Sequence, residues 1–200
     1  NTGWEAALSL TKLRTNNFHW QSFFNLPVPR NTLVNYPGIV QSSYYNPFRV
    51  ASPSHIILLY QYQGIDPETG FYSVADINED GRLDYEDRIV IQDLGRKFFG
   101  GINNNFSYKN FSLNFLWEFV KQEGSLTFLN PGGLSNQSED VIQSLDTDSR
   151  YQTISQSYEA SVAYYDALDS TFPYVDASFL RLKTFSVGYS LPTNFLNSMG

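Results

Sequence analysis

The sequence contains no cysteine and only two histidines, His19 and His55, among its 200 residues. The absence of cysteine excludes disulfides, thiolate metal sites and cysteine nucleophiles together. Two histidines far apart in the chain argue against a transition-metal centre or a histidine-based catalytic triad. The sequence also has no glycine-rich phosphate-binding loop, and no pair of carboxylates stands out as catalytic. We therefore expect no enzymatic activity from this chain.

Charged residues and long apolar runs are also scarce. Asp, Glu, Lys and Arg make up 16% of the chain, against about 25% in typical soluble domains. The formal charge of −7 argues against a nucleic-acid partner, because phosphate binding needs a basic surface. No segment approaches the roughly 20 apolar residues of a transmembrane helix. Aromatic residues, by contrast, reach 16%, which suits a β-sheet with one strongly apolar face.

Alternating apolar and polar residues predict an all-β fold of antiparallel strands. The alternation is clearest from Phe111 onward, where apolar and mostly polar side chains take turns. Near Lys183 the alternation changes phase, which predicts a β-bulge. The pair Gly100-Gly101 falls inside a strand and predicts a bend or close packing there. The expected strands cover residues 3–14, 18–28, 98–108, 111–120 and 177–191.

The length of these strands favours a membrane-spanning β-barrel. Each has about 10 residues or more, which is the length of a transmembrane strand, whereas soluble strands average about 5–6. Their polar faces consist mainly of Ser, Asn, Gln and His, as expected for a water-filled lumen. Alternation alone leaves a soluble β-sandwich as an alternative, because sandwich strands alternate in the same way.

The connections between the strands differ in length in a regular way. Short turns at residues 15–17 and 109–110 contrast with two long segments, residues 30–97 and 121–176. Short turns at one end and long loops at the other are typical of bacterial outer-membrane barrels. We therefore interpret both long segments as extracellular, and the apolar run at residues 56–62 as a short extracellular strand.

Residues 76–87 match the spacing of an EF-hand calcium loop. Calcium is a hard cation that binds six to eight oxygen ligands. Oxygen-bearing side chains occupy the first, third, fifth, ninth and twelfth positions, and glycine occupies the sixth, where the backbone turns sharply. The seventh position would contribute its backbone carbonyl. The predicted ligands are Asp76, Asn78, Asp80, Arg82, Asp84 and Asp87.

Two features distinguish this loop from a calcium sensor. Its twelfth position is Asp87 instead of the commoner glutamate, which shortens the reach of the carboxylate to the ion. Gly64, Pro67 and Gly70 lie directly upstream, so the flanks do not form two long amphipathic helices. A polar turn built from Asx-turns would use the same residue types. We expect calcium to act as a structural cofactor that braces the segment at residues 30–97.

Several separate blocks of the sequence carry a further signal. The blocks are residues 1–5, 17–20, 60–72, 76–81, 176–183 and 188–192. In this order they resemble the SusC/RagA group of TonB-dependent outer-membrane transporters, and the resemblance spans nearly the whole chain.

The resemblance implies a fold, a location and a set of partners. The chain would be a late part of a large β-barrel whose N-terminal region forms a plug. Its partners would be a SusD-like surface lipoprotein and, through the missing N-terminal region, TonB. The transported nutrient would be an oligosaccharide or a peptide, and the location the outer membrane of a Gram-negative, Bacteroidetes-like bacterium. Because the chain opens directly into a strand pattern, we expect residues 1–200 to be a fragment of the barrel domain.

A second class of protein fits the same composition. A secreted, calcium-stabilised β-sandwich could bind carbohydrate on an aromatic platform. A soluble hydrolase fragment that uses acidic residues is a third hypothesis. Dependence on detergent separates the first hypothesis from the other two, because part of a barrel presents its aromatic face to lipid and aggregates in water.

Overall fold

The computed structural model describes residues 1–12, 15, 17–45, 47–126 and 158–192. The chain divides into two compact units, each built from separate stretches of sequence. Unit 1 comprises the described parts of residues 1–31, 96–122 and 177–200, and unit 2 those of residues 32–95 and 123–176. Among the described residues, no helix is both long and apolar enough to cross a membrane.

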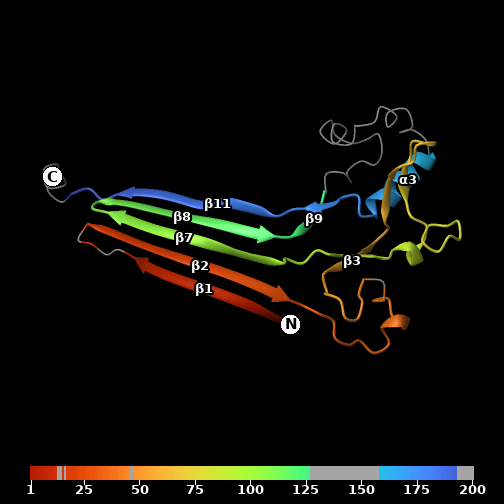
Figure 1. The fold of residues 1–200 in the computed structure, drawn as a ribbon, viewed down its shortest axis with the longest axis horizontal. Helices are drawn as coiled ribbons and strands as arrows, with labels where there is room; N and C mark the ends of the chain where they lie inside the picture. The colour runs from red at the N-terminus through yellow and green to blue at the C-terminus, as the bar shows by residue number, and fades with distance from the viewer. Residues whose placement is uncertain (13–14, 16, 46, 127–157, 193–200) are drawn as a thin grey trace. The chain divides into compact units, whose positions relative to one another are not determined.

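Unit 1 is an antiparallel sheet of five long strands in the order β1-β2-β7-β8-β11 (Figure 1). The strands are β1 (Thr2–Lys12), β2 (Phe18–Arg30), β7 (Phe98–Tyr108), β8 (Phe111–Lys121) and β11 (Phe179–Tyr189). At the C-terminal end of β8, Phe98 pairs with Lys121 and Phe179 with Val120. The chain therefore leaves β8 and enters β7 and β11 at one end of the sheet.

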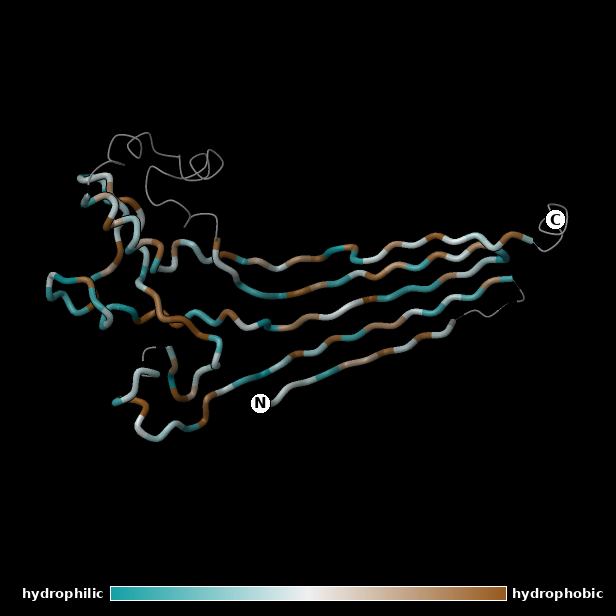
Figure 2. Tube along the Cα trace, turned by 180° about the vertical axis from the view of Figure 1, so that it is seen from behind, coloured by the Kyte–Doolittle hydropathy of each residue, from teal (hydrophilic) through white to brown (hydrophobic). Residues whose placement is uncertain are grey.

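The register places apolar side chains on one face of this sheet and mainly polar side chains on the other. One apolar row crosses all five strands through Leu8, Phe24, Ile102, Trp117 and Leu182. Figure 2 shows the alternation as hydrophobic and hydrophilic stretches along the long strands. The apolar face is open, with Leu8 52% and Leu182 45% exposed. Exposed apolar area costs about 25 cal/mol per Å², so this face needs an apolar environment.

Stacked aromatic rings reinforce the apolar face and enclose one polar contact. The Trp20 and Phe106 rings stack at a centroid distance of 5.6 Å, and Phe106 stacks with Phe115 at 5.9 Å. Asn104 lies among these residues with 8% of its surface exposed. The indole N–H of Trp20 donates to Asn104 Oδ1 over 3.1 Å, which satisfies both buried polar groups.

The strands predicted from the sequence are confirmed to within two residues at either end, although residues 13–14 of the first lie outside the described residues. The predicted bulge is also confirmed, because the β8–β11 register shifts between Leu182 and Thr184. Leu180 and Phe185 consequently share the apolar face despite their different sequence phase. The predicted close packing at Gly100 is confirmed as well, since a Cβ there would lie 2.1 Å from the Asn25 carbonyl oxygen.

The described residues of unit 2 form short strands and one helix. Its strands form three two-stranded sheets, β3 with β6, β4 with β5, and β9 with β10. Two 3-10 turns, η1 (Ile39–Gln41) and η2 (Tyr85–Asp87), lie in the first long segment, and helix α3 (Tyr158–Leu168) lies in the second. The strands are β3 (Ile56–Leu59), β4 (Tyr62–Ile65), β5 (Tyr72–Val74), β6 (Val90–Asp93), β9 (Glu123–Ser125) and β10 (Tyr174–Asp176).

An aromatic core holds the two long segments together within unit 2. Tyr164 of α3 is fully buried and lies 5.6 Å from the Tyr72 ring of β5. Phe172 lies 5.4 Å from Tyr72 and 4.9 Å from Tyr62. Backbone hydrogen bonds join Tyr60 to both Asp169 and Thr171. The described parts of both long segments therefore pack as one body; residues 127–157 of the second lie outside the described residues.

Helix α3 was not predicted from the sequence. Its residues include Tyr158, Tyr164 and Tyr165, and aromatic residues favour strands. Its apolar residues form only a weak stripe at the helical period, so the pattern gave no helix signal. Packing of Tyr164 against β5 supplies the stabilisation that the local sequence lacks.

Candidate functional site

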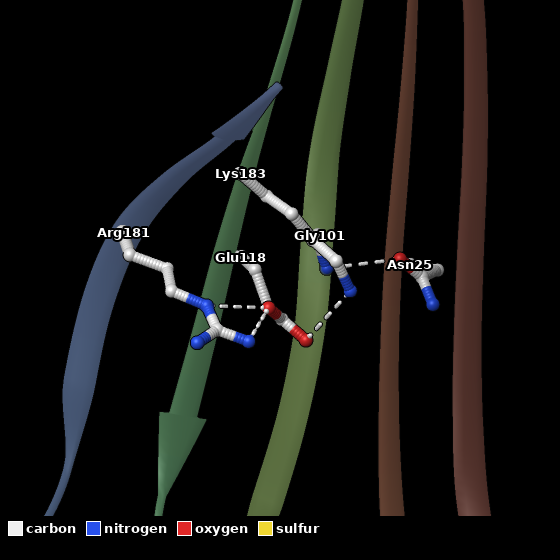
Figure 3. Close-up of polar contacts among 5 residues, drawn as sticks. All are labelled: Asn25, Gly101, Glu118, Arg181 and Lys183. Carbon is white, nitrogen blue, oxygen red and sulfur yellow. Dashed lines mark hydrogen bonds and ion pairs between the residues drawn. The ribbon is translucent and has the colours of Figure 1, made fainter.

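A row of polar groups crosses the polar face of unit 1 in the same register. Asn25, Gly101, Glu118 and Arg181 lie side by side on β2, β7, β8 and β11. Figure 3 shows two basic side chains converging on the Glu118 carboxylate. Arg181 Nε and Nη2 lie 2.8 and 2.7 Å from Glu118 Oε2, and Lys183 Nζ lies 3.4 Å from Oε1.

The bulge in β11 explains why two basic residues of one strand meet a single carboxylate. Leu182 pairs with Trp117 and Thr184 with Leu116, so Lys183 has no partner residue in β8. An extra residue of this kind re-aims its side chain, and bulges are frequent beside functional sites. The sequence predicted the bulge, but the ion cluster was missed because only the register brings Glu118 next to β11.

Gly101 and Asn25 complete the row on the adjoining strands. The Gly101 backbone N–H donates to Asn25 Oδ1 over 2.9 Å, which fixes the orientation of the amide. A Cβ on Gly101 would lie 3.1 Å from the Trp117 carbonyl oxygen, a close contact that a small shift of the strands relieves. Glycine here places no side chain of its own between the Asn25 amide and the ion cluster.

The predicted calcium loop lies in unit 2, between β5 and β6. Its oxygen side chains accept backbone N–H groups further along the loop. Asp76 Oδ2 accepts from Gly81, Asn78 Oδ1 from Asp80, and Asp80 Oδ1 from Arg82, over 2.8–3.1 Å. Gly81 has φ 79°, which favours glycine and gives the sharp turn predicted at the sixth position.

Asp87, the twelfth position of the loop, is fully buried. Its Oδ1 accepts the backbone N–H of Ile77 over 2.8 Å and that of Asn78 over 3.4 Å, and its Oδ2 accepts the N–H of Asp84 over 3.0 Å. These hydrogen bonds, with that from Asp84 first, lower the pKa of the Asp87 carboxyl. Asp84 Oδ1 in turn accepts from Glu86 and begins η2. The Asp87 carboxylate thus links the beginning of the loop, at Ile77 and Asn78, to its end, at Asp84.

The oxygen donors of the loop fit a hard cation such as calcium. Asp76 Oδ1 is buried and has no hydrogen-bond partner among the described residues, so this oxygen is left for a ligand. Within the same part of the chain, no three His, Asp or Glu side chains are grouped to hold a metal by themselves. A calcium ion would therefore also need Asn78 Oδ1 and the Arg82 backbone carbonyl.

Arg88 follows the loop directly and links it to the second long segment. Its Nη2 lies 2.6 Å from Asp169 Oδ2, and its guanidinium carbon lies 4.7 Å from the Tyr60 ring centre. The hydrogen bond to Tyr60 and the charge of Asp169 raise the pKa of Arg88 against the opposing effect of burial. No spacing in the sequence signals this contact, because Arg88 and Asp169 are 81 residues apart.

No family model matches the chain. Among curated proteins, TonB-dependent receptors P3 and P26 of Formosa agariphila are 24% and 23% identical to it over its full length. The chain spans only 22% and 23% of those relatives. Among solved structures, the RagAB peptide importer matches in its open-open state with a TM-score of 0.64, 15% identity and 97% of this chain covered. Its closed-closed state matches with a TM-score of 0.59, 18% identity and 95% coverage.

In sequence, the chain is similar to proteins named TonB-dependent receptors. Both solved structures are states of RagAB, so the fold is similar to part of that protein. Each match covers 22–23% of the matched chain. The resemblance to SusC/RagA-type TonB-dependent transporters is thereby confirmed as a similarity in sequence and in fold.

Proposed function

We propose that this chain forms part of the wall of a TonB-dependent uptake transporter in a Gram-negative outer membrane. The observation that carries the proposal is the five-stranded sheet of unit 1, with an open apolar face and a polar opposite face. Lipid covers the apolar face and the polar face lines the lumen. Further strands of the same protein pair with the outer edges of β1 and β11, because lipid does not tolerate unpaired backbone.

The sheet architecture favours this function over the calcium-stabilised β-sandwich. A sandwich needs two large facing sheets with a shared core. The described residues contain one five-stranded sheet, and their other sheets have two strands each. Many large apolar side chains of unit 1 are exposed, such as Leu180 at 65% and Phe185 at 62%, instead of packed against a second sheet.

The transported nutrient is an oligosaccharide or a peptide, captured together with a SusD-like surface lipoprotein and imported with energy from TonB. The name of the RagAB peptide importer supports the peptide alternative, and the resemblance to the SusC group supports the oligosaccharide. Unit 2 lies on the extracellular side, where a lipoprotein lid would meet it. Affinity purification of the full-length transporter should recover this lipoprotein.

Fractionation and gel mobility test the transporter assignment. We expect the full-length protein in the outer-membrane fraction, with a band that shifts between unboiled and boiled samples because a closed barrel resists detergent until heated. A soluble protein with one mobility would contradict the assignment. It would make the calcium-stabilised binding module the better account.

Calcium is proposed as a structural cofactor of unit 2, held at residues 76–87. The unpartnered Asp76 Oδ1, the oxygen-rich spacing and the glycine at the sixth position support this. Purified full-length protein should contain calcium, and Asp80→Ala should lose it. Glu79→Gln is the matched control. Glu79 is an acidic residue at the fourth position of the same loop, and the side chain at that position does not bind calcium in an EF-hand. Equal calcium content in Asp80→Ala and wild type would refute this site.

A further inference from the structure

The ion cluster of β8 and β11 has more hydrogen-bond donors than its own residues use. Glu118 accepts from both Arg181 and Lys183, so one negative charge meets two positive charges. The cluster therefore carries a net charge of +1 on a chain whose overall charge is −7. The other acidic residue on this face of the described strands is Glu5, on β1, three strands away from Glu118 in the sheet.

The unused hydrogen-bonding groups of the row are all donors. Among the described residues, Arg181 Nη1 and the Asn25 amide nitrogen have no hydrogen-bond partner, and Lys183 uses its ammonium only toward Glu118. The Arg181 guanidinium carbon also lies 4.8 Å from the centre of the Phe179 ring, a contact that leaves its N–H groups free to donate. The acceptors are already occupied, because Glu118 binds both cations and Asn25 Oδ1 accepts the Gly101 N–H. A surface that offers a guanidinium, an ammonium and an amide N–H is complementary to a carboxylate or a sulfate.

Three local features keep this surface open to a ligand. The bulge re-aims Lys183, and Gly101 places no side chain between Lys183 and Asn25. A glycine inside a strand often marks a position where a ligand approaches the backbone. The Arg181 and Lys183 side chains are 58% and 51% exposed, so both are accessible to a ligand.

The position of the row in the sheet suits an entry site. Gly101 is the fourth residue of β7 and Glu118 the fourth from the end of β8. At a rise of about 3.3 Å per residue, the row lies about 10 Å from the end of the sheet at which the long segments depart. In the proposed transporter this is the extracellular mouth of the lumen.

We propose that Arg181, Lys183 and Asn25 form a lumenal subsite that binds an anionic group, a carboxylate or a sulfate, of the imported nutrient. This inference rests on the proposed function, because it needs the polar face to line a lumen. Acidic peptides and acidic oligosaccharides share this chemistry. Glu118 is a positioning residue that holds the two cations together without contacting the ligand.

The test is calorimetric binding to the purified full-length transporter. Hexagalacturonate is compared with neutral maltohexaose, and a glutamate-rich octapeptide with its glutamine counterpart. We expect the anionic member of one pair to bind about fivefold more tightly than its neutral counterpart, with a preference that weakens as salt is added. The pair that responds identifies a sugar or a peptide as the source of the anion. Equal affinity for the anionic and neutral members of both pairs overturns the proposal.

Variants separate the subsite from a structural ion pair. Lys183→Gln keeps the Arg181–Glu118 pair and should reduce the preference for the anion about three- to fivefold without changing neutral binding. Glu118→Gln removes the competing negative charge and should increase the preference, whereas a purely structural role predicts no gain. Lys109→Asn, in the turn after β7, removes the same charge far from the row and should leave the preference unchanged. A preference that survives Lys183→Gln intact overturns the proposal.

Gel mobility of the same preparations distinguishes failure of the anion subsite from failure of the transporter assignment. A heat-shifted band with no preference for anions refutes the subsite alone and leaves the transporter assignment standing. A protein without a heat shift refutes the assignment and the subsite with it.

Discussion

At the scale of single residues, the most informative contact on the apolar face is the one between Trp20 and Asn104. A polar side chain among apolar side chains is costly unless its hydrogen bonds are made within the protein. Asn104 meets this condition by accepting the indole N–H over 3.1 Å while aromatic rings cover it. The pair therefore explains why asparagine is tolerated at a position where the strand pattern calls for an apolar residue.

Removing one partner of this pair should harm the protein more than removing both. Asn104→Leu leaves the indole N–H buried without an acceptor, which costs about 1–3 kcal/mol. Trp20→Phe combined with Asn104→Leu removes both polar groups and should restore most of that stability. The measurement is the midpoint temperature at which the folded band of the full-length protein disappears on an unboiled gel. A double variant no more stable than Asn104→Leu would show that packing, not the hydrogen bond, governs the position.

A second residue-scale prediction concerns Asp166 on α3. Burial, and then the charge of Asp169, raise the pKa of Asp166, while Arg88 lowers it. The folded state therefore binds this proton more tightly than the unfolded state does. The resulting stabilisation is complete below the usual aspartate pKa near 4 and is lost as the pH rises through the raised value. At pH 7 Asp166→Asn should stabilise unit 2 by less than about 1 kcal/mol, the scale of partly exposed charges.

Hydrogen exchange of the peptide that covers α3 measures this effect. Exchange in Asp166→Asn should be slower than in wild type at pH 7 and should vary less between pH 4 and pH 8, after correction for intrinsic rates. Asp169→Asn is the matched control with the opposite sign, because it removes the partner of Arg88. Faster exchange in Asp166→Asn would mean that the carboxylate stabilises the helix at neutral pH.

At the scale of elements, the close approach of β2 and β7 depends on Gly100. A Cβ there would lie 2.1 Å from the Asn25 carbonyl oxygen and 2.8 Å from Phe119 Cζ, and the first of these atoms belongs to the backbone. Gly100→Ala should therefore separate the strands locally and cost about 1–3 kcal/mol or more. Gly101→Ala is the neighbouring contrast, because its nearest atom is 3.1 Å away and a small shift relieves the contact.

Assembly in the outer membrane is the readout for this pair. Gly100→Ala should give a smaller heat-shifted fraction than wild type, and Gly101→Ala a fraction close to it. Equal assembly of both variants would mean that β2 and β7 can move apart at Gly100 without cost.

The sequence predicted the long strands well because their alternation is set by a two-sided environment along the whole strand. Lys183 is instructive, since the phase change in the sequence correctly located the bulge. The contact between Lys183 and Glu118 could not be predicted, because it requires the register of two strands separated by a long segment. The oxygen spacing of the calcium loop was visible, whereas the burial of Asp87 and its role in closing the loop were not.

At the scale of the whole molecule, the two long segments form one unit, although strands of unit 1 precede and follow each of them in the sequence. The described contacts between them within unit 2 include the Tyr60 backbone bonds and the Arg88–Asp169 pair. Arg88 is adjacent in sequence to Asp87, which closes the proposed calcium loop. We therefore expect the Arg88 guanidinium to couple the order of the loop to that of α3. Such coupling requires that a single perturbation changes both regions.

We therefore predict that removing calcium loosens α3 as well as the loop. In purified full-length protein, EDTA should accelerate hydrogen exchange in peptides covering residues 76–93 and 158–168 together. Arg88→Gln with calcium present should accelerate exchange at residues 158–168 and leave the loop protected. Arg82→Gln, which removes the same charge from an exposed position in the loop, should do neither. If EDTA affects the loop alone, the two segments are joined by their aromatic core and Arg88 transmits nothing between them.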